Sequence, residues 1–286
     1  MNTHPTKIIL QGPAANEHTA ALIAAQVGAD KPTMIASTAW RADLPSALSE
    51  QSTTLIQKLC QEVKIDFALL PADLQLHDFK LLVMDMDSTL ITIECIDEIA
   101  DMQGLKSEVA AITDAAMRGE LDFSESLQRR VALLKGLDES ALARVFEQRL
   151  ELTLGAHSML HAMKQAGLRT VLVSGGFTYF TERLEHELEL DVSHANRLEV
   201  IDGKLTGRVL GNIVDAQAKK STVIEQCAEL GVPSSAAIVI GDGANDLAMM
   251  SVAGLSIAFR AKPVVQAKAH VALNYSGLDG VVSLFL

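Results

Sequence analysis

Short apolar runs alternate with amphipathic stretches over most of the chain, and this rhythm predicts its secondary structure. In residues 76–91 and 151–286, each apolar run has the length of a buried strand and leads into a stretch with helical spacing. The predicted strands of this part are residues 80–84, 169–174, 236–241, 255–259 and 271–273. The predicted helices are residues 157–165, 179–189, 219–230, 244–251 and 263–267. Repeated strand–helix units predict an α/β fold with a Rossmann-like parallel sheet and helices on both faces.

Two other regions have a different rhythm. In residues 1–75 a small α+β domain is predicted, with strands 7–11, 33–37 and 65–70 and helices 17–27 and 51–63. In residues 92–150 helical spacing dominates, which predicts a helical insert built from helices 95–102, 106–117, 123–134 and 139–148. Within the α/β part, Asp202 and Gly203 separate two short apolar runs, 198–201 and 204–209, and predict a β-hairpin.

Composition narrows the choice of cellular setting and partners. The chain is 49% hydrophobic and only 4% aromatic, an aliphatic make-up that suits buried parallel strands. Its net charge of -12 argues against nucleic acid and anionic membranes as partners. The chain lacks a secretion signal and an apolar run of the ~18 residues that a membrane span needs, so we expect a cytoplasmic protein, monomeric or homodimeric. The scattered cysteines predict reduced thiols.

Two aspartates follow the predicted strand 80–84 directly. Asp85 and Asp87 are followed by Ser88 and Thr89, so acidic and hydroxyl groups gather where the strand ends. A lone aspartate in such a place usually caps a helix or forms a turn. A pair permits phosphoryl chemistry, because one carboxylate can attack phosphorus while a neighbour with a raised pKa moves protons. We therefore interpret Asp85 as a nucleophile and Asp87 as a general acid and base.

Electrostatics then calls for a divalent cation. Two carboxylates repel a phosphate dianion, and Mg²⁺, a hard ion with oxygen ligands, is the cation that fits this role best. A further ligand is expected on a neighbouring strand end. Asp242 follows the predicted strand 236–241 between two glycines, and Asp246 comes one helical turn later.

Phosphate ligands are expected on two more segments. Ser174 ends the predicted strand 169–174 and is followed by Gly175, so a hydroxyl and exposed backbone N–H groups come together at the start of a helix. Lys219 stands at the beginning of a predicted helix, where the helix dipole disfavours a cation. We interpret Lys219 as reaching the phosphate and Asp85, with the adjacent Lys220 as its competitor.

The order of these motifs resembles the haloacid dehalogenase (HAD) superfamily. The four segments are Asp-Met-Asp-Ser-Thr from residue 85, Ser-Gly-Gly from residue 174, Lys219, and Gly-Asp-Gly-Ala-Asn-Asp from residue 241. The resemblance runs from about residue 81 to the C-terminus. It implies that Mg²⁺ is held by the Asp85 carboxylate, the Asp87 carbonyl and Asp242, while Asp246 supports the metal's water shell and Lys219. It also implies catalytic Asp85 and Asp87, and phosphate binding by Ser174, Gly175 and Lys219.

Within the superfamily the chain is most similar to the members that hydrolyse O-phosphoserine. That resemblance implies release of L-serine and phosphate through an aspartyl-phosphate intermediate, as the last step of serine biosynthesis. It also implies that residues 92–150 form a cap over a core of residues 76–91 and 151–286. Glu94 would bind the substrate ammonium and Arg130 its carboxylate, with Phe123 covering the ligand and Asn245 adding a polar contact. Arg129 lies beside Arg130 and competes for its role.

Alternatives of three classes remain from the sequence. The first class is other phosphoryl chemistry: transfer to another alcohol such as homoserine shares the first half-reaction, and other small-molecule phosphatases of the superfamily share both half-reactions. The N-terminal domain loosely resembles the amino-acid-binding ACT domains, although no strand is predicted between Arg41 and Glu50, so a regulatory binding module is a second class. A non-catalytic descendant is the third, and the joint presence of the four motifs argues against it.

Overall fold

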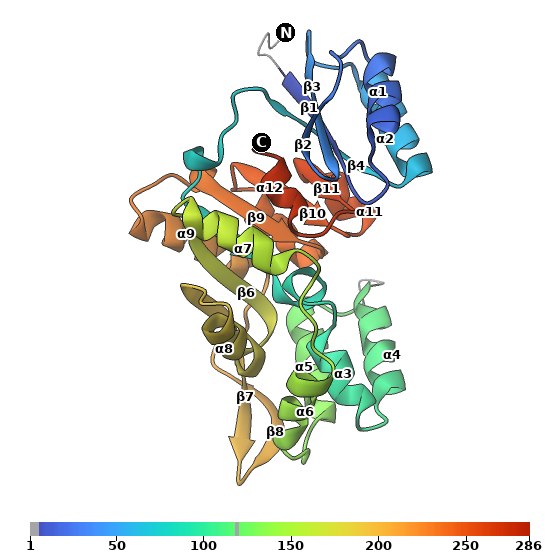
Figure 1. Ribbon diagram of the computed structural model, residues 1–286. Coiled ribbons are helices and arrows are strands. Elements are labelled where there is room, and N and C mark those ends of the chain that lie inside the picture. The colour runs from blue at the N-terminus through green and yellow to red at the C-terminus, as the bar shows by residue number, and fades with distance from the viewer. Residues whose placement is uncertain (1–5, 118–119) are drawn as a thin grey trace.

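The computed structural model describes residues 6–117 and 120–286 and contains two β-sheets (Figure 1). The larger sheet has seven strands in the order β11-β10-β9-β5-β6-β7-β8. All neighbours pair in parallel except β7 and β8, which are antiparallel. The strands are β5 (Leu81–Met84), β6 (Arg169–Phe177), β7 (Val192–Ile201), β8 (Lys204–Leu210), β9 (Ala237–Gly241), β10 (Leu255–Phe259) and β11 (Val271–Leu273). The predicted α/β class and parallel sheet are confirmed.

Helices cover both faces of this sheet because successive strand residues point to opposite sides. Leu82 and Met84 pack into the cluster that includes α7, whereas Leu81 and Val83 pack into the cluster that includes α9 and α10. The helices of this part are α7 (Ala156–Gln165), α8 (Thr178–Glu187), α9 (Ala216–Glu229), α10 (Leu247–Met250), α11 (Pro263–Gln266) and α12 (Gly280–Ser283). The sequence pattern did not predict α12, which is a single turn.

The β7–β8 hairpin turns at Asp202 and Gly203, as predicted, and both residues have positive φ, 50° and 72°. Two such residues in succession make the turn whose twist matches the flanking strands. The first strand was predicted too short. Residues 192–194 of β7 pair in parallel with β6, so the strand begins at Val192 rather than at residue 198.

The smaller sheet lies at the N-terminal end of the chain. It runs β1 (Thr6–Gln11), α1 (Glu17–Gln26), β2 (Thr33–Ala36), β3 (Ala39–Leu44), α2 (Glu50–Val63) and β4 (Asp66–Pro71). The strand order is β2-β3-β1-β4, and every pair is antiparallel, an arrangement of the split βαβ kind.

The expectation that no strand lies between Arg41 and Glu50 is wrong, because β3 extends to Leu44. This strand pairs on one side with β1, where Ile9 lies opposite Arg41, and on the other with β2. Its outer residues Arg41 and Asp43 form an ion pair at 3.1 Å. Backbone pairing on both sides, rather than apolar spacing, therefore stabilises the strand.

The two sheets are joined by apolar packing and by one buried carboxylate. Ile9, Ala68 and Leu70 belong to the same buried cluster as the C-terminal Phe285. The carboxylate of Asp66, 3% exposed, accepts hydrogen bonds from the backbone N–H groups of Asn274 (2.7 Å), Tyr275 (3.1 and 3.2 Å) and Ser276 (2.8 Å). The N-terminal sheet is thus fixed to the edge of the larger sheet.

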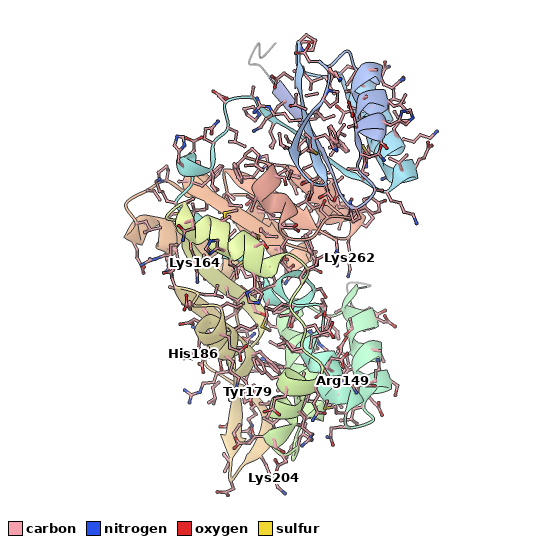
Figure 2. The ribbon with its side chains drawn as sticks, viewed as in Figure 1. Arg149, Lys164, Tyr179, His186, Lys204 and Lys262 are labelled. Carbon is pink, nitrogen blue, oxygen red and sulfur yellow. The ribbon has the colours of Figure 1, made fainter. Side chains whose placement is uncertain are left out.

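Within the described residues, four α-helices lie between β5 and α7, close to those predicted, and pack beside the β7–β8 hairpin (Figure 1). They are α3 (Cys95–Asp101), α4 (Lys106–Met117), α5 (Phe123–Leu133) and α6 (Ser140–Gln148). Arg149, after α6, donates to Glu98 at 2.8 Å and Asp101 at 3.3 Å on α3, which links the first and last helices of the group (Figure 2). We call residues 92–150 the cap.

The two chain segments that enter and leave the cap run side by side. Ile91 and Leu152 form an antiparallel bridge, and the N–H of Thr92 donates to the carbonyl of Glu151 at 3.0 Å. The chain therefore leaves the core for the cap and returns to it at neighbouring points. The cap is also hydrogen-bonded to the β7–β8 hairpin, where the N–H of Gly136 donates to the carbonyl of Leu205 at 2.7 Å. Among the described residues, no helix combines the length and apolarity required to cross a membrane.

Candidate active site

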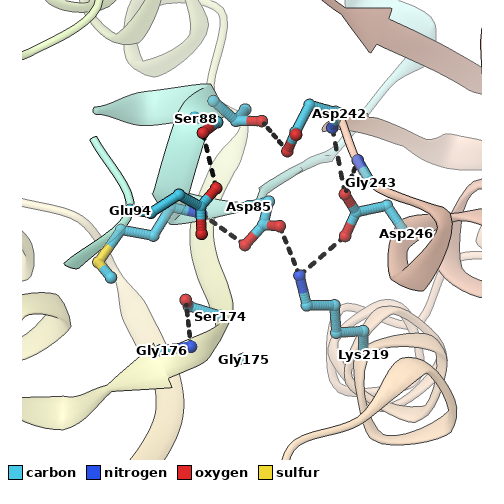
Figure 3. Close-up of polar contacts among 12 residues, drawn as sticks. Asp85, Ser88, Glu94, Ser174, Gly175, Gly176, Lys219, Asp242, Gly243 and Asp246 are labelled. Carbon is cyan, nitrogen blue, oxygen red and sulfur yellow. Dashed lines mark hydrogen bonds and ion pairs between the residues drawn. The ribbon is translucent and has the colours of Figure 1, made fainter. Parts of the chain in front are cut away.

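The carboxyl ends of three neighbouring strands meet at one edge of the larger sheet. Because β5 lies between β6 and β9, their ends bring Asp85, Ser174 and Asp242 to one place (Figure 3). The N–H of Asp85 donates to the carbonyl of Ile240 at 3.0 Å, which continues the β5–β9 ladder up to the acidic group. This placement is the one that open α/β sheets use for ligands.

A buried lysine joins two of the acidic groups. Nζ of Lys219 lies 2.7 Å from Oδ2 of Asp85 and 2.8 Å from Oδ1 of Asp246, and its side chain is 0% exposed (Figure 3). Burial lowers the pKa of Lys219, but Asp246 and Asp85 raise it by more, so the lysine is held charged. The contact with Asp85 belongs to Lys219; its competitor Lys220 is half-buried on the same helix.

The helix that carries Lys219, α9, begins at an N-terminal capping residue. Asp215 precedes α9, and its Oδ1 accepts hydrogen bonds from the N–H groups of Gln217 and Ala218, both at 2.9 Å. A carboxylate at this position satisfies donors that the first turn leaves unpaired. Asp215 therefore defines the start of α9, the helix from which the side chain of Lys219 enters the site.

Three carboxylates form an acidic cluster beside this lysine. One oxygen from each of Asp85, Asp242 and Asp246 lies within 4.8 Å of the others. Asp246 is oriented by the N–H groups of Asp242 (3.1 Å) and Gly243 (3.0 Å), and Thr89 donates to Oδ1 of Asp242 at 3.3 Å (Figure 3). With all three carboxylates ionised, a single ammonium leaves the group negative. Closely spaced oxygen ligands with excess negative charge fit a hard divalent cation.

The pKa values of Asp85 and Asp242 are raised, as expected for crowded carboxylates that a cation would stabilise. Burial first, and then Asp246, raise the pKa of Asp242 to about 7. The same two causes raise the pKa of Asp85 above its usual range, whereas Lys219 lowers it. A bound cation would act in the same direction as Lys219, because positive charge favours the ionised carboxylate.

Asp87 occupies a different environment from Asp85. Oδ1 of Asp85 accepts a 2.7 Å hydrogen bond from its own neighbour Met86, while Oδ1 of Asp87 accepts from the N–H of Cys95 at 3.2 Å, the first residue of α3. Burial first, and then the charge of Glu94, raise the pKa of Asp87 to about 7. A carboxyl group with that pKa can both donate and accept a proton near neutral pH.

The predicted strand end at Ser174 is three residues too early, because β6 runs to Phe177 with an irregular register after Val173. We call this irregular stretch, residues 174–176, the phosphate loop, and its glycines shape it. Oγ of Ser174, a residue 1% exposed, accepts a hydrogen bond from the N–H of Gly176 at 2.8 Å, so the hydroxyl hydrogen is directed elsewhere. A Cβ on Gly175 would lie 2.7 Å from Cζ of Phe123, and one on Gly176 would lie 2.8 Å from Oδ2 of Asp87. A side chain at either position would therefore displace Phe123 or Asp87, and Phe123 brings the cap against the loop.

Two charged residues of the cap face the acids of the core. Oε1 of Glu94 accepts a 2.7 Å hydrogen bond from the hydroxyl of Ser88, whose φ is 55° (Figure 3). Burial lowers the pKa of Arg130, and the carboxylates of Asp97, Glu94 and Asp87 oppose that shift, which places the guanidinium among them. Its hydrogen bond is long, 3.4 Å from Nε to the carbonyl of Ser126.

The remaining predicted residues are also placed by the structure. Arg129, the competitor of Arg130, forms an exposed ion pair with Glu125 at 2.6 Å and so points to solvent. The half-buried side chain of Asn245 lies against Gly243, where a Cβ would collide with Oδ1 of Asn245. Asn245 therefore lies on the Asp242 side of the site.

Two further residues belong to this site and were not singled out from the sequence. Asp97 lies near Arg130, and Asn196 donates to the carbonyl of Gly175 at 2.8 Å. Asp97 and Asn196 carry no local signal, because their neighbours come from distant parts of the chain. Thr89, by contrast, was expected at this strand end as a hydroxyl group, and it contacts Asp242.

Comparisons with known proteins identify the family of this chain. Residues 82–251 match the haloacid dehalogenase-like hydrolase family. A phosphoserine phosphatase from Polaromonas sp. is 54% identical over 217 residues, which cover 74% of this chain and 92% of that protein. A crystal structure of a HAD family hydrolase from Salmonella enterica serovar Typhi superposes with a TM-score of 0.90, 32% identity and 98% coverage of both chains. The unliganded probable phosphoserine phosphatase from Vibrio cholerae superposes with a TM-score of 0.82 and 36% identity, covering 98% of this chain and 86% of that chain. The chain belongs to the haloacid dehalogenase-like hydrolases.

Proposed function

We propose that this chain is a Mg²⁺-dependent phosphoserine phosphatase, which hydrolyses O-phospho-L-serine to L-serine and phosphate in the last step of serine biosynthesis. The observation that carries the proposal is the buried triad in which Lys219 bridges Asp85 and Asp246 at the end of β5. The choice of phosphoserine as the substrate is supported by the relatives that are named phosphoserine phosphatases. Opposite charges on the cap, Glu94 and Arg130, match the ammonium and carboxylate of serine.

The chemistry follows from the positions of the two aspartates. An oxygen of Asp85 attacks phosphorus, the bond from phosphorus to the serine oxygen breaks, and Asp87 gives its proton to that oxygen. Water then attacks the aspartyl phosphate, Asp87 takes its proton, and the bond from phosphorus to Asp85 breaks. Both carboxyl groups return to their starting states. The pKa of Asp87, near 7, suits a group that works in both directions.

The remaining groups of the site hold and neutralise the phosphoryl group. We assign Ser174, Gly175 and Lys219 to its oxygens. The Asp85 carboxylate, the Asp87 carbonyl and Asp242 would hold Mg²⁺, which supplies charge neutralisation at the phosphoryl oxygens. Asp246 would orient Lys219 and water on the metal, because it already bonds Lys219 at 2.8 Å.

The cap is assigned to substrate selection. Glu94 would bind the ammonium, Arg130 would bind the carboxylate in bidentate fashion, and Phe123 would cover the ligand from its place against Gly175. Asn245 would add a polar contact from the core. Exclusion of water by the cap would strengthen these contacts.

The proposal extends to the organisation of the whole molecule. We assign residues 1–75 to a loosely ACT-like α+β domain, residues 92–150 to the cap, and residues 76–91 and 151–286 to the catalytic core. The separate buried cluster formed by the N-terminal strands and helices supports the first division. We also propose a cytoplasmic enzyme that is a monomer or homodimer and takes a small molecule as its partner.

A panel of phosphorylated metabolites tests the proposal. Phosphate release with Mg²⁺ is expected to give the highest kcat/KM for O-phospho-L-serine, and chelation with EDTA is expected to abolish it until Mg²⁺ is restored. Equal kcat/KM values across the panel would instead indicate a general phosphatase. Formation of a new phosphate ester when homoserine is added would indicate phosphoryl transfer rather than hydrolysis.

A further inference from the structure

One buried amide connects the phosphate loop with the segment that leads to Lys219. Asn196 lies on β7 and is 1% exposed. Its Nδ2 donates to the carbonyl of Gly175 at 2.8 Å, and its Oδ1 accepts from the N–H of Val214 at 2.8 Å. Both ends of one side chain are therefore used, one on each of two segments distant in sequence.

The first bond fixes the plane of a peptide in the loop. The carbonyl of Gly175 and the N–H of Gly176 belong to the same planar unit. Asn196 donates to its oxygen, and Oγ of Ser174 accepts from its N–H with a nitrogen-to-oxygen distance of 2.8 Å. With both polar groups of this peptide held, the loop cannot rotate there without breaking a hydrogen bond.

The second bond locates the start of α9. Val214 directly precedes Asp215, the residue that caps α9, and Lys219 lies one turn into that helix. Asn196 thus ties the loop that carries Ser174 to the helix that carries Lys219. These two elements supply the proposed phosphate ligands from opposite sides of Asp85.

We infer that Asn196 is a positioning residue, which sets the distance between the phosphate loop and Lys219. The inference rests on the proposed function, since it assigns these groups to one phosphate. An apolar residue of similar size would leave the part-buried carbonyl of Gly175 and N–H of Val214 without these partners. The phosphate loop and the start of α9 would then no longer be hydrogen-bonded to the same side chain.

The test is Asn196→Leu, compared with Thr170→Val. Thr170 is fully buried at the opposite end of β6 and bonds Asp191 at 2.9 Å, so its variant loses a buried hydrogen bond far from the loop. Asn196→Leu is expected to lower kcat/KM by about 10- to 100-fold, the equivalent of one or two lost buried hydrogen bonds. Thr170→Val is expected to change it less than about threefold at a similar loss of Tm.

A comparison of two substrates separates positioning from general damage. Phosphoserine and p-nitrophenyl phosphate share only the phosphate, so Asn196→Leu is expected to lower kcat/KM for both by the same factor and to weaken inhibition by inorganic phosphate. The inference is overturned if Asn196→Leu loses no more activity than Thr170→Val, or if inhibition by phosphate is unchanged. Wild-type protein without phosphoserine hydrolysis would overturn the proposed function instead.

Asn196→Asp provides a second variant in case the leucine variant does not fold. Assayed at a pH where it is ionised, its carboxylate can still accept from Val214 but cannot donate to the carbonyl of Gly175. Loss of activity on both substrates together with a Tm near that of wild type would assign the effect to the loop. Wild-type kcat/KM in this variant would exclude a role of the Gly175 bond.

Discussion

The core and the cap contribute to the site in different ways. In the core, Lys219, Asp85 and Asp246 are buried and joined by contacts of 2.7 and 2.8 Å. In the cap, Arg130 makes one long hydrogen bond of 3.4 Å, to its own helix, among the residues that the structure describes. The core groups are fixed before a substrate arrives, whereas the guanidinium keeps donors available for one.

This difference assigns rigidity and adaptability to separate parts of the chain. Charged groups that stabilise a phosphoryl transfer work best when they are already in place, since no reorganisation is then needed during the reaction. Groups that recognise a small ligand can complete their hydrogen bonds when it binds, so that binding itself organises this part of the site. Substitutions in the core should therefore affect every substrate, and substitutions in the cap should affect phosphoserine most.

The largest effect is expected from Asp85→Asn. The amide is a poor nucleophile of nearly the same shape, so phosphoserine hydrolysis should fall by more than about 10³-fold while the protein stays folded. Phosphate release and thermal unfolding measure the two parts. Asp191→Asn, at the opposite end of the sheet, is the control and should remain active; undiminished turnover of Asp85→Asn would remove the proposed nucleophile.

Lys219→Met is expected to affect both activity and stability. Without the ammonium, Asp85 and Asp246 are left buried without their ion-pair partner, a change that costs about 3–5 kcal/mol in comparable sites. Urea unfolding of the metal-free protein measures this loss, and hydrolysis of both substrates should fall together. Lys220→Met should leave both nearly unchanged, and equal effects at the two positions would contradict the assignment.

Arg130→Ala tests the cap half of the comparison. Loss of a bidentate carboxylate contact should raise KM for phosphoserine by about 10- to 100-fold, with a much smaller change for p-nitrophenyl phosphate. Arg129→Ala is the matched control, because that side chain pairs with Glu125 at the surface. If Arg130→Ala raises KM equally for both substrates, Arg130 does not bind the carboxylate.

Asp66→Asn should have the smallest effect on catalysis. Its carboxylate anchors the N-terminal sheet through backbone N–H groups far from the active site, so the free energy of unfolding should fall by about 1–3 kcal/mol with kcat/KM unchanged. Asp43→Asn, in an exposed ion pair, should cost less. A large loss of activity in Asp66→Asn would mean that the N-terminal sheet influences the site.

The sequence predicted the parts of the fold that local pattern determines. Strands such as β5 and β9 are continuous apolar runs, and the polar residues after them lie where parallel strands must end together, so the meeting of Asp85 with Asp242 follows from spacing and topology. The hairpin turn at Asp202 and Gly203 was predictable for a similar reason, because its residues tolerate positive φ.

Features that depend on distant partners were not predicted. Strand β3 contains Arg41 and Asp43 and is defined by its pairing with β1 and β2, which no local apolar spacing announces. Asn196 connects Gly175 with Val214, and each partner lies many residues away. A single buried amide in a sequence gives no indication of which carbonyl and which N–H it will meet.

The joint between core and cap has a consequence for how such proteins can diversify. Because Thr92 and Glu151 are hydrogen-bonded neighbours at 3.0 Å, the chain leaves the sheet and returns to it at nearly the same point. An insertion with adjacent ends can be lengthened, shortened or exchanged without changing the path of the surrounding chain. Grafting between these two residues a cap that keeps the backbone hydrogen bonds to the β7–β8 hairpin is therefore a direct way to give the same catalytic sheet a different substrate.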